Sequence, residues 1–398
     1  MAVANTYSSL LPSIFGMVTT IVRTQSIMPR LVLNLSDDIA GQPGSTVQMP
    51  DQITGVTRAV VHDISPADPT NLALTATPLT LSNWREAPFT IDDKMGAEVV
   101  AGTIPRVLQS YASALADYVD SQILALYTSI YNTGASDAFG GGATALPAAF
   151  TVDATKNPSG LRAVAEAGTL IDQLGAPKGD RRVVLSAYDT WAAQILGQFL
   201  KFNERGDQGG IIDGEIGRKI GMDWWMDQQV VTHTCGTVGS TAGQTLTCPT
   251  ANVGDTAITF VGTITTALTL KAGDVFIFNN SNQTYVNNTL VTSTTNSLPL
   301  SSFSPPLKVA VTAANSAKVL PSHKVNLLFH RDAIAFASRP LGGIGNPDNV
   351  AQAFDEVSGL NLRVEIMRQN KQDYVSIDCL FGAALRDAKL IARVASQV

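Results

Sequence analysis

The sequence predicts an α+β fold in which a small antiparallel β domain, a barrel or sandwich, is inserted into an α/β domain. Three observations carry this prediction. An apolar stripe at helical spacing runs from Leu108 to Ile130, the length of one long helix. Helices and buried strands then alternate as far as Thr232. From residue 233 to residue 318 almost all charge disappears while Thr, Ser, Asn and Gly become abundant, which is typical of short strands joined by turns.

The composition excludes several classes of protein. The 398 residues are 45% hydrophobic and only 15% charged, so the chain can bury enough apolar surface to fold and is not disordered. The most apolar N-terminal stretch, Leu10 to Leu35, is broken by Arg23, Pro29 and Arg30, so it is too short to cross a bilayer core of ~30 Å. It also lacks a basic leader, which argues against a signal peptide. Low charge without a membrane span indicates surface buried against other copies, and hence an obligate assembly.

Charge and cysteine content narrow the compartment and the partners. A net charge of −6 argues against a dedicated nucleic-acid binder, which normally concentrates basic residues on one face. Three cysteines are too few for a disulfide framework. Cys235 and Cys248 could pair locally or stay separate as buried thiols, and we expect separate thiols in a cytosolic environment.

Residues 1–46 form the first predicted part of the chain. They are almost uncharged, and Leu11 to Val22 can form a short helix before an extended, proline-interrupted stretch. The segment has too few alternating positions to build a core of its own. We therefore expect an arm that lies on another surface.

Residues 47–94 predict a long β-hairpin. Its expected strands are Val47–Met49, Thr57–Val61 and Thr77–Trp84, separated by glycine and proline. A lone two-stranded hairpin is marginal in water, and few large apolar residues lie between these strands. The hairpin must therefore dock on a neighbour or be mobile.

Residues 95–152 carry the long helix. Thr103 and Pro105 suit its first turn, and Gly134 can follow its end. At 1.5 Å per residue it is ~40 Å long. A coiled coil would show more heptads and more flanking charge, so we expect a long helix packed on a sheet.

Residues 153–232 predict the first part of the α/β domain. Ser159 can cap a helix that ends near Gly175, and Arg182–Ser186 is a buried strand. A second helix, Tyr188–Phe202, carries Trp191, Ile195 and Phe199 on its apolar side. A glycine-rich loop then leads to a strand over Met222–Thr232.

The remaining chain completes the predicted organisation. Residues 233–318 are the inserted domain, with expected strands at Thr256–Val261, Ala267–Leu270, Asp274–Phe278, Thr284–Val286 and Val309–Val311. Because α/β patterning resumes at Val325, residues 319–350 return to the α/β domain. Residues 351–398 supply closing strands.

No arrangement of residues predicts a catalytic, cofactor or metal site. The four histidines are scattered, and His323 and His330 are seven apart, which is not the spacing that places two ligands on one helix face. Cys379 lies in an apolar strand and is expected to be an inert packed thiol. Asp223 and Asp227 are expected to be surface carboxylates. The adjacent Trp224 and Trp225 point to opposite faces of a strand, so one is core and the other is free to contact another subunit.

The order of these parts resembles the major capsid (coat) proteins of tailed bacteriophages, and more narrowly the coat proteins of short-tailed Salmonella phages. The stretches that carry the resemblance are Val183–Asp189, Asp213–Asp223, Asn326–Pro340, Leu360–Ile366 and Tyr374–Ala388. Each motif is weak alone, and their order along essentially the whole chain gives the resemblance its weight.

The resemblance implies the tailed-phage capsid fold, which is shared with the floor of herpesvirus capsids. In the terms of that fold, 1–46 is the N-terminal arm, 47–94 the extended hairpin (E-loop), 95–152 the spine helix and peripheral domain, 153–232 and 319–350 the axial domain, 233–318 the inserted β domain, and 351–398 the closing strands of the peripheral domain.

The function implied is structural and not enzymatic. Copies of the chain would form hexamers and pentamers of an icosahedral shell, assembled in the host cytoplasm around double-stranded DNA that is contacted non-specifically. A portal protein is expected, as is a separate scaffolding protein, because no long charged helical segment precedes the arm. No cofactor and no membrane are implied. The candidate intersubunit contacts are Arg58, Trp84, Arg85, Glu86, Trp224 and Trp225.

The shell is expected to be non-covalent. Some relatives join subunits through a lysine on the hairpin, but Val47–Ile91 contains no lysine, and its cations are Arg58 and Arg85. An arginine guanidinium stays protonated and is a poor nucleophile. The alternative function is a virion-associated adhesin or other structural virion protein whose Thr/Asn-rich β domain binds a glycan.

Overall fold

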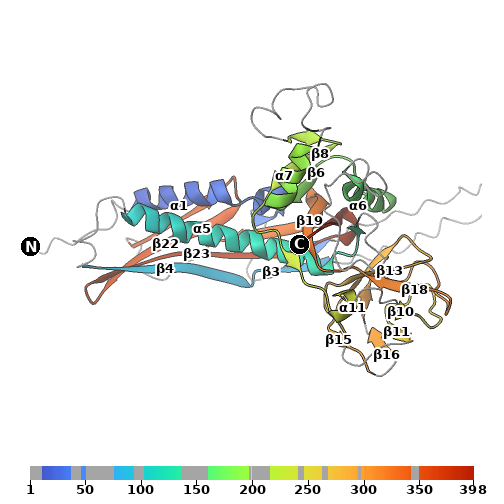
Figure 1. Cartoon of the computed structure of the whole chain (residues 1–398). Coiled ribbons are helices and arrows are strands. Elements are labelled where there is room, and N and C mark those ends of the chain that lie inside the picture. The colour runs from blue at the N-terminus through green and yellow to red at the C-terminus, as the bar shows by residue number, and fades with distance from the viewer. Residues whose placement is uncertain are drawn as a thin grey trace, which may run out of the picture. The chain divides into compact units, whose positions relative to one another are not determined.

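The computed structural model describes residues 11–36, 46–50, 76–93, 103–135, 160–196, 199, 216–240, 246–261, 268–294, 297–300, 302–341 and 349–398. Strands dominate a mixed α+β architecture, which confirms the predicted fold class. The chain divides into two compact units (Figure 1). Unit 1 comprises Met1–Thr24, Leu33–Leu115 and Ile334–Asp387, and unit 2 comprises Gln25–Val32, Ala116–Ala333 and Ala388–Val398.

Unit 1 is built on a six-stranded sheet with the long strand β23 at its centre. On one side β23 pairs with β20 and then β22, and on the other side with β4, whose ladder runs from Asp92 opposite Gln372 to Asn83 opposite Phe381. Figure 1 shows β4, β22 and β23 as long neighbouring ribbons. The strands are β1 (Leu33–Asn34), β4 (Asn83–Asp92), β20 (Ile334–Arg339), β21 (Val350–Asp355), β22 (Leu360–Gln369) and β23 (Gln372–Leu385).

The described part of the predicted hairpin docks on this sheet. Strands β2 (Thr46–Pro50) and β3 (Ala76–Thr80) pair antiparallel. Met49 and Leu79 are buried in one apolar cluster with Ala335 and Ala337 of β20. The base of the hairpin therefore has a core only because β20 supplies half of it. Residues 51–75, with the predicted strand Thr57–Val61, lie outside the described residues.

The two longest helices among the described residues are α1 and α5. Helix α1 (Leu11–Gln25) is held to unit 1 by an ion pair of Arg23 with Asp355 at the end of β21, where Asp355 also accepts hydrogen bonds from Ser358. Helix α5 (Thr103–Leu124) follows the predicted stripe and ends in a 3₁₀ turn, η2 (Ala125–Ser129). In unit 1 its Tyr111 ring stacks on Phe89 of β4 at 5.2 Å.

Unit 2 contains a second sheet, ordered β5-β24-β19-β6-β8-β7, with β9 also paired to β19. Strand β6 runs parallel to β8, and α6 packs against β5 and β24. The elements are α2 (Met28–Leu31), β5 (Thr133–Gly134), α6 (Arg162–Gln173), β6 (Arg181–Leu185), α7 (Ala187–Ile195), β7 (Arg218–Lys219), β8 (Met222–Met226), β9 (Thr232–His233), β19 (His323–His330) and β24 (Ile391–Ser396).

The sheets divide the C-terminal part of the chain differently from the predicted boundaries. β20, placed with residues 319–350 in the axial domain, belongs to the sheet of unit 1, whereas β24, placed among the closing peripheral strands, belongs to the sheet of unit 2. The physical reason is that two short 3₁₀ turns, η3 (Arg331–Ala333) and η5 (Ala388–Leu390), carry the chain from one sheet to the other. No composition change marks either turn.

The inserted domain is a seven-stranded antiparallel sheet, ordered β16-β11-β10-β18-β13-β14-β17. It is nearly closed, because Phe303 of β17 donates its backbone N–H to the oxygen of Thr256, just before β11. A small sheet of β12 and β15 and a short helix, α11, complete it. Its elements are α11 (Thr237–Ser240), β10 (Leu246–Thr247), β11 (Ile258–Val261), β12 (Thr269–Leu270), β13 (Val275–Phe278), β14 (Thr284–Asn287), β15 (Val291–Thr292), β16 (Ser297–Leu300), β17 (Phe303–Ser304) and β18 (Ser316–Val319).

Candidate functional site

The described residues do not assemble a chemical site. Within them, no group of three or more His, Cys, Asp or Glu side chains is arranged to hold a metal ion. The three cysteines are buried free thiols, and burial raises the pKa of Cys248 and of Cys379 to about 12. A thiol with so high a pKa is a poor nucleophile. None of the described helices has the length and apolar character to cross a membrane.

Helix α7 presents its large apolar side chains to solvent. Tyr188, Trp191 and Ile195 are 56%, 67% and 70% exposed, and their spacing of three and four residues places them on one face, here called the α7 stripe. The sequence predicted Trp191, Ile195 and Phe199 together on one apolar side of this helix. The structure separates them, since Phe199 is buried against Trp224, at 5.4 Å between ring centroids, whereas Trp191 and Ile195 are exposed.

The inward face of α7 explains why the large side chains of this helix are exposed. Thr190 and Ala193 are its buried side chains besides the acidic Asp189, and both are small. A helix whose small residues face its own sheet packs closely against that sheet and leaves its large residues outside. The α7 stripe is therefore surface that the isolated chain does not cover within the described residues.

A buried hydrogen-bond network fixes α7 in this orientation. Asp189 is fully buried and accepts hydrogen bonds from Ser186 Oγ at 2.8 Å, Asn326 Nδ2 at 2.8 Å and Ser396 Oγ at 2.6 Å. Ser186 also caps the helix by accepting the Asp189 backbone N–H. Because this network joins α7 to β19 and β24, turning the stripe inward would break the buried hydrogen bonds that Asn326 and Ser396 donate to Asp189, which costs free energy.

Strand β8 places its two tryptophans on opposite faces. Trp224 is 8% exposed and donates its Nε1–H to Lys219 O at 3.1 Å. Trp225 is 43% exposed and Met226 is 39% exposed. Trp224 is thus a core residue of unit 2, and Trp225 is the member of the pair that remains available to a second subunit.

In unit 1 the exposed aromatic side chain on β4 is held in one orientation. Trp84 is 63% exposed, and its Nε1–H donates to Asp378 Oδ2 at 3.0 Å. Asp378 in turn accepts two hydrogen bonds from Arg363, from Nε to Oδ1 at 2.9 Å and from Nη2 to Oδ2 at 2.5 Å. An exposed tryptophan whose N–H is already satisfied offers apolar area at little further entropic cost, which is typical of an interface anchor.

The other predicted contact residues differ in their surroundings. Arg85 and Glu86 are exposed beside Trp84 on β4, and Glu86 accepts hydrogen bonds from Ser376 at 3.1 Å and Tyr374 at 3.4 Å within its own unit. Arg58 lies outside the described residues. The roles of these residues at a subunit boundary stay predictions.

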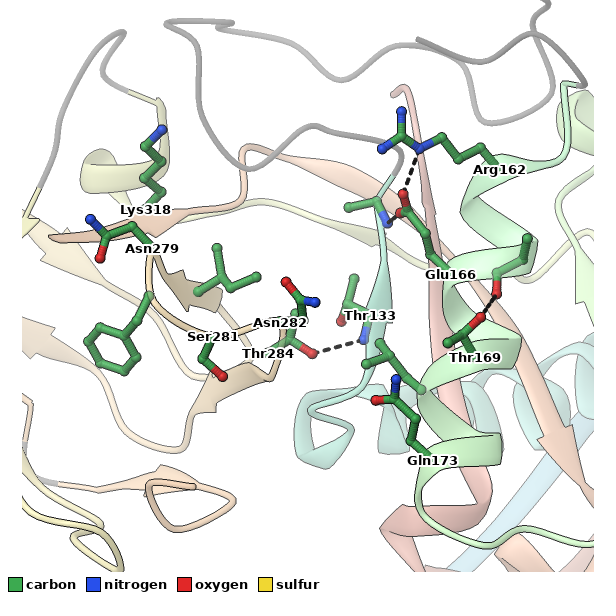
Figure 2. Close-up of a pocket in the computed structure, with 15 residues that line it drawn as sticks. Thr133, Arg162, Glu166, Thr169, Gln173, Asn279, Ser281, Asn282, Thr284 and Lys318 are labelled. Atoms are coloured by element: carbon green, nitrogen blue, oxygen red, sulfur yellow. Dashed lines mark hydrogen bonds and ion pairs between the residues drawn. The ribbon is translucent and has the colours of Figure 1, made fainter. Parts of the chain in front are cut away.

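A cleft of about 580 Å³, lined by both polar and apolar residues, separates α6 from the turn between β13 and β14 (Figure 2). Thr284 and Glu166 close its floor, because they accept the backbone N–H groups of Thr133 and Ala135 at the free edge of β5. The aromatic residue that lines the cleft, Phe278, is 1% exposed. The described lining of the cleft therefore offers hydroxyl, amide and charged groups, but no exposed ring on which a sugar could stack.

Comparison with known proteins gives matches among solved structures alone: no family model and no curated protein matches the chain. A structure from Mycobacterium phage Che8 is 15% identical, covers 93% of this chain and 90% of that chain, and has a TM-score of 0.45. The capsid of cyanophage P-SCSP1u is 13% identical over 92% of this chain and 87% of its own, with a TM-score of 0.47. The mature capsid of bacteriophage PhiM1 is 9% identical over 93% and 86%, with a TM-score of 0.46. Two of these three similar structures are described as phage capsids.

Proposed function

We propose that this chain is the major capsid protein of a tailed double-stranded DNA phage, whose copies self-assemble into an icosahedral shell. The proposal rests on the chain's own features, because the structural likenesses have TM-scores of only 0.42 to 0.47. The order of arm, hairpin, long helix and interrupted α/β domain supports the assignment to the capsid protein class. The exposed α7 stripe supports self-association of the chain.

The stripe is large enough to contribute substantially to an interface. With 150–250 Å² for a whole aromatic side chain, three side chains exposed by more than half leave on the order of 400 Å² of apolar surface in water. That is comparable with the largest apolar patch of a typical monomer, which is often functional. Trp84 and Trp225 add exposed aromatic area in unit 1 and unit 2 respectively.

Assembly of the purified full chain tests this proposal. Trp191→Ser combined with Ile195→Ser should leave the monomer folded and raise the protein concentration needed for assembly at least about tenfold, because hot-spot residues contribute about 2 kcal/mol or more each. Leu290→Ser is the matched control, since Leu290 is 69% exposed but belongs to no stripe. Sedimentation velocity and electron microscopy would read the outcome. A stripe variant that assembles like the wild type contradicts the role of the stripe, and a wild type that stays monomeric at every concentration contradicts the proposed function.

The remaining partners belong to the same proposal. A separate scaffolding protein, a portal protein and non-specific contact with packaged DNA are what the sequence resemblance implies, together with assembly in the host cytoplasm. The adhesin alternative needs a glycan site on the inserted domain, and the cleft of Figure 2 lacks an exposed ring. We therefore prefer the capsid protein proposal to the adhesin alternative.

The bonding between subunits gives a second test. Mature particles boiled in detergent should run as one band near 42.0 kDa, because Val47–Ile91 of the hairpin contains no lysine to form an isopeptide bond. Particles kept in reductant serve as the control for disulfides. A ladder of pentamer- and hexamer-sized species that resists boiling and reductant would show a covalent shell.

A further inference from the structure

The inserted domain joins the sheet of unit 2 through a neck made by two strands. The chain enters at His233 on β9 and returns at His323 on β19, and these two residues are direct register partners. Their rings lie 5.3 Å apart between centroids, and the two residues are 3% and 0% exposed. Two histidines therefore face each other, out of water, at the point where one domain meets the next.

His233 ties the neck to the inserted domain. Its Nε2 lies 2.8 Å from Asp274 Oδ1, and its Nδ1 lies 3.1 Å from the Tyr127 hydroxyl of η2. Asp274 is fully buried and also accepts the backbone N–H groups of Gly236 and Lys271. The one buried carboxylate at the described neck is thus already shared by the imidazole and two backbone donors.

His323 has no comparable partner. Its Nδ1 lies 2.8 Å from Pro321 O, and a carbonyl can only accept, so Nδ1 carries the hydrogen. The lone pair on Nε2 is buried without a hydrogen-bond partner. A proton added at Nε2 would place a charge where no described side chain accepts it.

The charged groups around His323 oppose a further proton. Arg393 of β24 is fully buried, donates from Nη1 to Gly273 O at 2.8 Å, and leaves Nε and Nη2 without partners. Its guanidinium lies 5.2 Å from the Tyr127 ring. The other titratable groups at the neck are His233, Tyr127, Asp274, Cys235 and Lys271, and of these only Asp274 is a carboxyl group. Burial first, and then the charges of Arg393 and His233, lower the pKa of His323 to about 3.

We propose that the neck is an acid-released latch, in which protonation of His323 at Nε2 separates the inserted domain from the sheet while both remain folded. Once the neck opens, water solvates the imidazolium and the distance to Arg393 grows. The closed neck is fully favoured above pH 6.5, where His323 is neutral in both forms, and it loses stability as the pH falls from 6.5 towards 3. The latch is independent of whether the chain builds a capsid.

The three native cysteines report on this opening. Cys235 is buried at the neck against Ser322, at 3.3 Å between Sγ and Oγ, Cys248 lies in the core of the inserted domain, and Cys379 lies in the sheet of unit 1. The unassembled full chain is exposed at pH 7.5 to 3.5 to an aromatic disulfide that reacts with thiols in acid. Each rate is divided by the rate for the same cysteine in denatured protein at that pH, and peptide mass spectrometry assigns the site.

We expect Cys235 to become reactive below about pH 6, rising up to tenfold for each pH unit as expected for one proton, while Cys248 and Cys379 stay protected. His323→Asn, whose Nδ2–H can still reach Pro321 O, should remove this rise. His330→Asn is the matched control on the same strand and should behave like the wild type. Simultaneous labelling of all three cysteines, or an unchanged rise in His323→Asn, would overturn the latch. If all three cysteines of His323→Asn react at pH 7.5, that variant is misfolded. His323→Gln then replaces it as the test variant, provided that its cysteines react in the wild-type order at pH 7.5.

Discussion

The inserted domain and helix α7 both contain clustered aromatic side chains. Those of the inserted domain are buried, whereas those of α7 are exposed to solvent. In the inserted domain five rings are at most 1% exposed, with neighbouring centroids 5.4 to 6.4 Å apart. They are Phe260, Phe276, Phe278, Tyr285 and Phe303. On α7, Tyr188 and Trp191 are more than half exposed.

The difference teaches where each region finds its partner. A nearly closed sheet encloses its own inner face, so its rings pack on one another and the domain has a complete core. A single helix on a sheet has one inner face, and α7 fills that face with Thr190 and Ala193. Among the described residues, its large side chains stay mostly exposed. We therefore assign folding stability to the first cluster and association to the second.

The most severe test of this comparison is Phe276→Ala. Phe276 contacts four other rings of the inserted domain, so truncation should cost about 3–5 kcal/mol of unfolding free energy through lost burial and a cavity. Urea unfolding followed by far-UV circular dichroism measures it. Trp191→Ala is the paired variant and should change monomer stability by less than about 0.5 kcal/mol. Equal losses in the two variants would erase the distinction.

Trp84 extends the comparison to unit 1, with a smaller effect. Trp84→Ala should leave monomer unfolding nearly unchanged and weaken association by about 2 kcal/mol, because an anchored aromatic is lost from the surface. Trp84→Phe keeps a ring but loses the N–H to Asp378, so it isolates the value of holding the ring in place, and we expect an intermediate result. Analytical ultracentrifugation over a concentration series gives both numbers. A strongly destabilised Trp84→Ala monomer would place Trp84 in the fold instead.

Sequence reasoning reaches the regions whose signal is local. The inserted domain is delimited by a change in composition, and α5 by one continuous stripe, so both could be predicted. β10, β15 and β17 are two residues long and carry too few alternating positions to be recognised, whereas β12 lies within the predicted strand Ala267–Leu270. The predicted strand Val309–Val311 is reduced to a single bridge between Ala251 and Val311.

The orientation of α7 could not be predicted, for a physical reason. Apolar residues at helical spacing look the same whether their face meets the chain's own sheet or another molecule. The signal that decides lies partly in distant residues, Asn326 and Ser396, which hold Asp189 and so fix the helix. The same holds for the neck, where the pairing of His233 with His323 is set by strand register and not by sequence spacing.

The smallest expected effect concerns a buried acid whose removal should stabilise the fold and leave association untouched. Asp120 of α5 is 2% exposed and accepts the backbone N–H groups of Ile27 and Met28 at 2.9 and 3.1 Å. Burial, and next the charge of Asp227, raise the pKa of Asp120 to about 8. Asp227 itself has a buried oxygen, Oδ2, without a partner.

The sign of the pH dependence follows from that raised pKa. Between pH 3.8, where the unfolded chain releases this proton, and about pH 8 the folded chain retains it. Folding stability therefore falls as the pH rises through this window and levels off above it. Asp120→Asn is neutral throughout and still offers an oxygen to the backbone, so it should lose this slope and exceed the wild type by about 1–2 kcal/mol at pH 8. Urea unfolding at pH 5, 6.5 and 8 measures the slope, with the exposed Asp180→Asn as control. If Asp120→Asn is less stable than the wild type at pH 8, the ionised carboxylate is needed to hold Ile27 and Met28. If Asp120→Asn changes the protein concentration needed for assembly, buried contacts of unit 2 also govern association.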